Sequence, residues 1–166
     1  HCSPLDWPED VTALRVRRIT QDEHLSYIAT RPSVSFLQTP AWGRIKVGWQ
    51  AQSLGWFDGE TLIGAGLLLL RPVPRVRKYL AYLPEGPDLD WATHGGDALD
   101  ALAAYARGIG AFQIKVGPHV WRRRWHADTI KDALARGENG GLADLASDEA
   151  NPHAESLIAL MRARGW

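Results

Sequence analysis

Cysteine and net charge are what this sequence has least of. Only Cys2 is present, so a disulfide framework within the chain is excluded, and a reducing compartment is favoured. Nineteen basic residues balance nineteen acidic ones. The chain therefore has no overall field that would draw it to nucleic acid or to a membrane, and local clusters would have to supply any such attraction.

A long hydrophobic run is also missing. The longest, Leu62 to Leu70, is far shorter than the roughly 20 residues that cross a bilayer. The opening "HCSPLDWPED" lacks the basic-then-apolar pattern of a secretory signal. Because the chain starts at His1 rather than methionine and stops at "MRARGW", which is typical of a helix about to enter a strand, we expect it to be a piece of a larger protein.

The common catalytic and metal-binding motifs are absent as well. The six histidines show no metal-ligand spacing, so each is interpreted as a surface or cap residue: His1, His24, His94, His119, His126 and His153. Neither a G-x-S-x-G elbow nor a Walker lysine loop occurs, and "GIGAF" lacks the third glycine of a dinucleotide fingerprint. A nucleophilic role for Cys2 is not expected. We predict no metal site and assign no catalytic residue.

The first half of the chain predicts strands and short helices. Residues 14–19 alternate apolar and basic side chains, as a half-buried strand does. Thr20 and Glu23 form the pattern of a capping box that opens a helix, and a second helix is expected from Pro40, capped by Thr39 and stopped by Gly48. "AQSLGWF" and "TLIGAGLLLLR" flank Asp58-Gly59-Glu60, in which the Asp-Gly pair predicts a hairpin turn.

The second half alternates helices and strands. After a third strand, "KYLAYL", and the turn "PEGPDLDW", we expect a helix from about Asp97 to Arg107 and a short buried strand, "AFQIKVGP". Two further helices follow, one capped by Asp128 or Thr129 and one ended by Gly165. This order predicts an α/β fold with a mixed sheet flanked by helices.

Two basic clusters stand out. One consists of Arg71, Arg75, Arg77 and Lys78, and the other, "WRRRW", places Arg122, Arg123 and Arg124 between Trp121 and Trp125. Arginine forks suit phosphates, and neighbouring aromatics stack on bases or sugars. Alternatively, the arginines cover apolar surface while their charged heads stay in water, and we favour this second interpretation for each cluster.

Lys46 has a different setting. In the helix expected from Pro40, Trp42 and Lys46 are four residues apart and share a face, with Ile45 beside them. This pattern suits an anion site as well as a lysine stem packed on an aromatic ring, and the spacing leaves both open.

Three stretches together resemble one known family: "SFLQTPAWGRIKVGW", "SLGWFDGETLIGAGLLLLRPVPRVRKYLAYLPEGPDLDW" and "AFQIKVGP". They are similar to the FemABX peptidyltransferases, FemX-type members above all, which move amino acids from aminoacyl-tRNA to the stem peptide of peptidoglycan precursors. The resemblance implies a GNAT-like (acyl-CoA N-acyltransferase-like) fold. It further implies that residues 14–166 are the first of two such domains, after an N-terminal extension, residues 1–13. The second domain would be absent, and we expect the chain alone to be inactive.

The resemblance also implies a binding site. Lys46 matches a lysine that contacts the phosphates of the UDP-linked precursor, and Gly117 stands where the family has an acidic residue before a proline. A Gly117 N–H could still approach the ligand. Trp42, Arg44, Lys46 and Gly117 are the predicted substrate-binding residues. The implied partners are UDP-MurNAc-pentapeptide or its lipid-linked form, aminoacyl-tRNA as co-substrate, and the inner face of the membrane, in the cytoplasm. No metal or prosthetic cofactor is expected.

Two other functions remain open. An acyl-CoA-dependent GNAT acetyltransferase needs a Q/R-x-x-G-x-G/A loop that opens a helix, and the nearest match, Gln52 to Phe57, fails at its last place and lies in a predicted strand. A non-catalytic module could bind the precursor or tRNA through the two basic clusters, and its binding would weaken steeply with salt.

Overall fold

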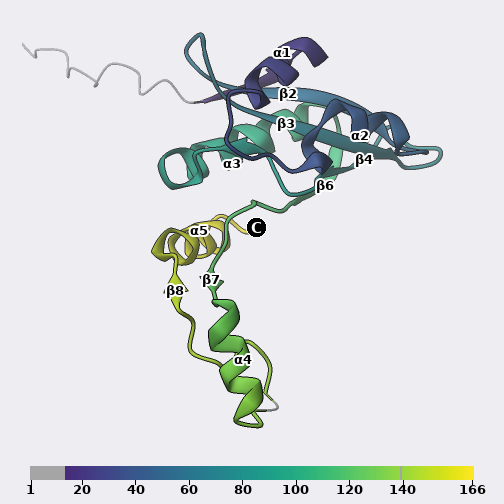
Figure 1. Ribbon diagram of the computed structural model, residues 1–166. Coiled ribbons are helices and arrows are strands. Elements are labelled where there is room, and N and C mark those ends of the chain that lie inside the picture. Colours follow the sequence, from purple (N-terminus) through teal and green to yellow (C-terminus); the bar gives the residue numbers. More distant parts are fainter. Residues whose placement is uncertain (1–13, 139) are drawn as a thin grey trace, which may run out of the picture. The chain divides into compact units, whose positions relative to one another are not determined.

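A computed structural model describes residues 14–138 and 140–166, which form two compact units (Figure 1). The first unit ends at His119 and the second runs from Val120 to Trp166. Predictions that concern residues 1–13, including those for His1 and Cys2, lie outside the described residues. The extent of a single domain over residues 14–166 stays a prediction.

The first unit is built on one mixed sheet (Figure 1). Its strands are β1 (Arg15–Arg18), β2 (Gln50–Asp58), β3 (Thr61–Pro72), β4 (Tyr79–Leu83), β5 (Asp88–Leu89) and β6 (Ala111–Val116). They lie in the order β1-β2-β3-β4-β6, with β5 also paired to β3, and every pair is antiparallel except β4 and β6. The predicted fold class, α/β with a mixed sheet flanked by helices, is confirmed.

Helices cover both faces of this sheet (Figure 1). They are α1 (Gln21–Ile28), the short 3₁₀ helix η1 (Phe36–Gln38), α2 (Pro40–Ile45) and α3 (Trp91–Gly108). Successive β2 side chains point to opposite faces. Ser53 therefore contacts His24 of α1, whereas Trp56 donates its indole N–H to the Ala98 carbonyl of α3. Because both faces are covered, every residue of β3 from 64 to 70 is buried.

Two local capping signals of the first unit were predicted correctly. The Thr20 hydroxyl accepts from the Glu23 N–H at 3.1 Å, and the Glu23 carboxylate accepts from the Thr20 N–H at 2.7 Å. Thr39 caps α2 as expected. The hairpin turn lies one residue later than the Asp-Gly pair suggests, because Asp58 pairs with Thr61 and leaves Gly59-Glu60 as the loop. Gly59 has a φ of 56°, which favours glycine at that position.

Three further expectations for the helices and strands of the first unit were wrong. The long helix α3 begins at Trp91 instead of about Asp97, because the Asp90 carboxylate caps it by accepting from the N–H groups of Ala92 and Thr93. Strand β6 is not buried but lies at the end of the strand order, where Phe112 is 59% exposed. Helix α2 ends at Ile45, so that Lys46 is its C-cap residue and Gly48 lies beyond it.

The second unit pairs two helices with a small sheet. Strands β7 (Arg123–Arg124) and β8 (Glu149–Ala150) are antiparallel, and the helices are α4 (Ala127–Ala135) and α5 (Pro152–Ala163). The predicted caps of α4, Asp128 and Thr129, were wrong, since His126 is the N-cap residue. Asp148 accepts from the His126 N–H at 2.6 Å and from the Thr129 hydroxyl at 2.8 Å, which holds the pKa of its carboxyl below the usual range.

Candidate functional site

The candidate site centres on Lys46, whose ammonium lies over an aromatic ring. Its Nζ is 5.1 Å from the centre of the Trp42 ring, and Phe36 meets the same ring edge-on at 5.4 Å. The expected contact between Lys46 and Trp42 is thus present, even though α2 ends at Ile45, one residue before Lys46. A cation–π contact orients an ammonium without using its N–H donors, so these donors stay available for an anion.

A strip of neighbouring residues leads from this pair toward Gly117 through Phe36, Ser35 and Glu85. Next to Phe36, the Ser35 hydroxyl donates to the Glu85 carboxylate at 2.5 Å. A Cβ on Gly117 would lie 3.7 Å from the Glu85 backbone nitrogen. The Gly117 N–H donates to the Leu83 carbonyl at 3.4 Å, so a ligand contact through that N–H would have to replace this bond.

The buried Gln38 side chain fixes the backbone on both sides of the strip through two hydrogen bonds. This side chain is 1% exposed, its amide donates to the Pro84 carbonyl, and its Oε1 accepts from the Leu67 N–H at 2.9 Å. It thus ties the start of α2 to β3 and to the turn that carries Glu85. Gln38, four residues before Trp42, therefore anchors the segment that leads into α2. The sequence offered no sign that Ser35 and Glu85 would join the site.

Arg44 points away from Lys46. Its guanidinium donates to the Gln21 side chain of α1 at 3.2 Å. It lines a cavity of about 690 Å³ beside α1, α2 and β2, together with Arg17 and Arg18 of β1. Of the four predicted binding residues, the structure thus brings Trp42, Lys46 and Gly117 into one strip and places Arg44 elsewhere.

The first basic cluster is exposed. Arg71, Arg75, Arg77 and Lys78 surround the β3–β4 connection, and none of them takes part in an ion pair within the described part of the chain. The guanidinium carbon of Arg71 lies 5.9 Å from the centre of the Trp49 ring. These cations are available to a partner.

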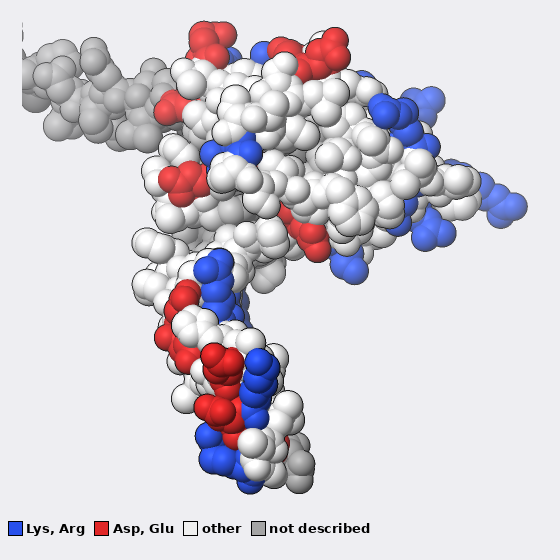
Figure 2. Space-filling model, in the orientation of Figure 1, with Lys and Arg blue, Asp and Glu red and all other residues white. Residues whose placement is uncertain are grey.

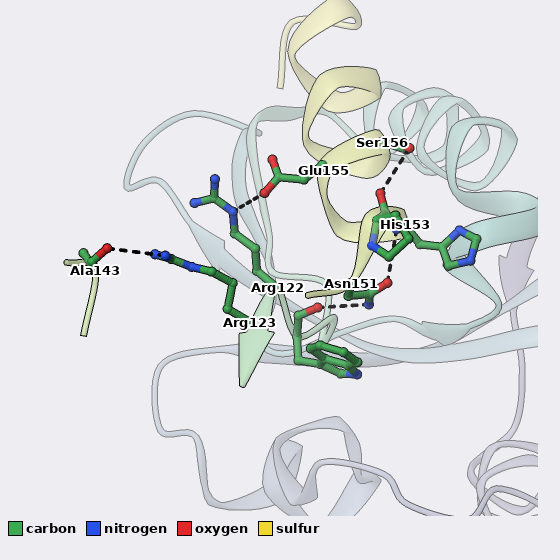
Figure 3. A network of polar contacts seen from close by, with 9 residues as sticks. Arg122, Arg123, Ala143, Asn151, His153, Glu155 and Ser156 are labelled. Carbon is green, nitrogen blue, oxygen red and sulfur yellow. Dashed lines mark hydrogen bonds and ion pairs between the residues drawn. The ribbon is translucent and has the colours of Figure 1, made fainter. Parts of the chain in front are cut away.

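The second basic cluster is engaged within its own unit. Arg122 pairs with Glu155, and Arg123 donates to the Ala143 carbonyl (Figure 3). The guanidinium of Arg124 lies 4.1 Å from the Trp121 ring centre, and that of Arg123 lies 5.1 Å from the Trp125 ring centre. Arg123 and Arg124 thus pack over tryptophans, as the second interpretation expects, whereas Arg122 is held by an ion pair. These contacts lie within the second unit.

His24 is a buried core residue, which corrects the expectation of a surface or cap role. Its Nδ1 lies 2.9 Å from the Ser53 hydroxyl, and burial lowers the pKa of the imidazole to about 4. It is therefore neutral near pH 7.

Across residues 14–138 and 140–166, no group of three or more histidine, cysteine, aspartate or glutamate side chains is placed to hold a metal. In the same residues, no helix is both long and apolar enough to span a membrane.

Comparison with known proteins places this chain in a family. A sequence model of the FemAB family matches residues 19–139, so the chain belongs to the FemAB family. It is similar to the lipid II:glycine glycyltransferases of Staphylococcus aureus (32% identity over 109 residues) and Staphylococcus epidermidis (26% over 108 residues). Each match covers 61% of this chain but only about a quarter of the relative, 25% and 26% respectively.

A solved structure agrees with this assignment. The crystal structure of FemX matches 74% of this chain and 31% of its own, with a TM-score of 0.54 and 25% identity. The chain therefore spans less than a third of the FemX chain that it matches.

Proposed function

We propose that this chain is the precursor-binding part of a transferase that moves an amino acid from aminoacyl-tRNA to the stem peptide of a peptidoglycan precursor. Family membership and the naming of its relatives as lipid II:glycine glycyltransferases support this class of reaction. The observation that carries the proposal is the ammonium of Lys46, held over the Trp42 ring on an accessible strip. The enzyme would act in the cytoplasm and touch the inner face of the membrane.

In this reaction Lys46 binds the phosphates of the precursor. The stem-peptide amine attacks the ester carbonyl of aminoacyl-tRNA, an amide bond forms, the ester bond to the ribose breaks, and the amine proton ends on the ribose oxygen. Because that ester is already activated, the protein contributes mainly positioning and stabilisation of the oxyanion. No residue of this chain is assigned as acid or base, and no cofactor is required.

The rival functions receive less support. The segment closest to an acyl-CoA loop, Gln52 to Phe57, lies inside strand β2, where its backbone groups pair with neighbouring strands and cannot cradle a pyrophosphate. A binding module that uses both basic clusters would need the "WRRRW" arginines, yet these are engaged within the second unit.

A titration with UDP-MurNAc-pentapeptide, followed by tryptophan fluorescence, tests the proposal. Trp42 lies against Lys46 and should report binding. Lys46→Ala should weaken binding about tenfold or more, roughly 1.4 kcal/mol. Lys131→Ala is the matched control, because it removes an exposed lysine on α4 and should leave binding unchanged.

Two outcomes would contradict this assignment. Binding that survives Lys46→Ala but is lost in Arg75→Ala/Arg77→Ala would move the site to the first basic cluster and favour the non-catalytic module. Aminoacyl transfer by the 166-residue chain alone would contradict our expectation that it is inactive without a second domain.

A further inference from the structure

One end of the first unit's sheet combines exposed cations with exposed aliphatic side chains. The cations are Arg71, Arg75, Arg77 and Lys78, and the aliphatic residues are Ile45, Val47 and Val76. We call these seven residues the basic end. Among the described residues they come from two segments far apart in sequence, the C-terminal end of α2 and the β3–β4 connection.

The sheet register brings the two segments together. Gln50, which opens β2 just after the α2 segment, pairs with Leu70, one residue before Arg71. Trp49 bridges them, since its N–H donates to the Lys46 carbonyl at 3.2 Å and its ring lies beneath the Arg71 guanidinium. Beyond them, the Val73 N–H donates to the Lys78 carbonyl at 3.0 Å and closes the connection.

The segments that carry the basic end have no negative charge, and none is visible beside it among the described residues in Figure 2. The sequence has no aspartate or glutamate between Glu60 and Glu85, and none from His24 to Phe57. In Figure 2, blue and white atoms cover the right-hand end of the first unit, and no red atom of a described residue is visible there. The positive potential at this end is therefore not cancelled locally, and it favours an anionic partner.

The aliphatic side chains indicate which anionic partner fits. Val47 is 95% exposed, Ile45 66% and Val76 53%. Protein surfaces that bind single-stranded nucleic acid use aromatic rings to stack on bases. Exposed aliphatic side chains beside cations instead stabilise binding to a bilayer, because they are buried at the boundary between headgroups and acyl chains. Basic residues next to such tips are typical of segments that bind anionic lipid headgroups.

We propose that the basic end docks on the surface of an anionic lipid bilayer. The inference rests on the proposed function and deepens it, because it names the surface through which this chain would approach a lipid-carried precursor. Ile45 and Val47 flank Lys46 directly in the chain. When the two aliphatic tips enter the headgroup region, the Lys46 ammonium lies at the depth of the phosphates that link a precursor to its lipid.

Vesicle sedimentation with the 166-residue chain tests the docking surface. We expect binding to mixed phosphatidylglycerol–phosphatidylcholine vesicles, weak binding to pure phosphatidylcholine, and loss of binding as salt rises. Each cation near the surface contributes about fivefold, so Arg75→Gln/Arg77→Gln/Lys78→Gln should weaken binding about 100-fold. Val47→Ser/Val76→Ser should weaken it about tenfold without changing the charge.

A second triple variant provides the matched control. Lys131→Gln/Arg136→Gln/Arg162→Gln removes three exposed cations from the second unit and should bind vesicles like the unchanged chain. The docking proposal is overturned if both triple variants lose binding equally, or if the mixed vesicles bind no better than pure phosphatidylcholine. It is also overturned if tRNA displaces the vesicles and responds to the same basic-end variant, or if the aliphatic residues prove to bury a second copy of the chain.

The soluble precursor separates this proposal from the proposed function. Arg75→Gln/Arg77→Gln/Lys78→Gln should bind UDP-MurNAc-pentapeptide as the unchanged chain does, because Lys46 is intact. Loss of vesicle binding with normal precursor binding supports the docking surface. Normal vesicle binding without precursor binding contradicts the proposed function alone.

Discussion

Replacing Gly86 by alanine should show how tightly the turn beside the candidate site is packed. A Cβ at this position would lie 2.2 Å from Cδ of Gln38 and 2.3 Å from its Oε1. Gln38 cannot move aside cheaply, because both ends of its amide are hydrogen-bonded in a buried site. We expect Gly86→Ala to cost about 3 kcal/mol, at the upper end of ordinary overpacking.

Gln38→Ala removes the same obstacle but leaves its partners unsatisfied. The Leu67 N–H and the Pro84 carbonyl would each lose a buried bond. Leaving a buried polar group unpaired costs about 1–3 kcal/mol, so this single change should cost about 4 kcal/mol. In the double variant the alanine methyl has room, and the total should stay close to that of Gln38→Ala alone.

Urea unfolding followed by tryptophan emission would measure this double-mutant cycle. We expect a coupling free energy of about 2–3 kcal/mol. Gly108→Ala is the control, because nothing lies within 4 Å of a Cβ at the exposed end of α3, and alanine should be neutral or slightly stabilising there. Additivity of the two single changes within about 0.5 kcal/mol would refute the packing argument.

Two further predictions concern the core of the first unit. Burial lowers the pKa of His24 to about 4 from 6.5, so between these pH values the unfolded chain binds more protons. The contribution of neutral His24 to the free energy of unfolding is complete above about pH 6.5 and is lost as the pH falls toward 4. His24→Gln should flatten this dependence in urea titrations at several pH values, and an unchanged slope would contradict it. Trp56→Phe removes the 3.0 Å bond to the Ala98 carbonyl and should cost about 1–3 kcal/mol by the same method, whereas a neutral result would mean that this bond does not hold α3 to the sheet.

Features set by neighbouring residues were predictable from the sequence. The capping box at Thr20 and Glu23 and the cap at Thr39 need only a few adjacent side chains, and both are present. The start of α3 was placed about six residues too late, after Gly95 and Gly96, which have a low helix propensity. In the fold Gly95 is buried inside the helix, so its packing outweighs the low helix propensity of glycine.

Features that depend on distant residues were not predictable. Strands β7 and β8 are two residues each and pair across about 25 positions, so neither has a periodic pattern of its own. For the site, four-residue spacing correctly placed Lys46 beside Trp42. It could not show that Arg44 turns toward Gln21, or that Glu85 reaches Ser35 from 50 positions away, because tertiary contacts alone decide these directions.

The fully covered strand β3 has a consequence for the chain before it folds. "LIGAGLLLL" is uncharged and proline-free, the composition of segments that form intermolecular β-aggregates when exposed. Arg71 and Pro72 follow it at once, and Pro74 and Arg75 come next. A charge disfavours stacking of identical chains, and a proline interrupts their hydrogen-bond ladder. Arg71 and Arg75 belong to the basic end, which we propose to face a bilayer in the folded protein. Together with Pro72 and Pro74, they also keep the newly made chain from aggregating.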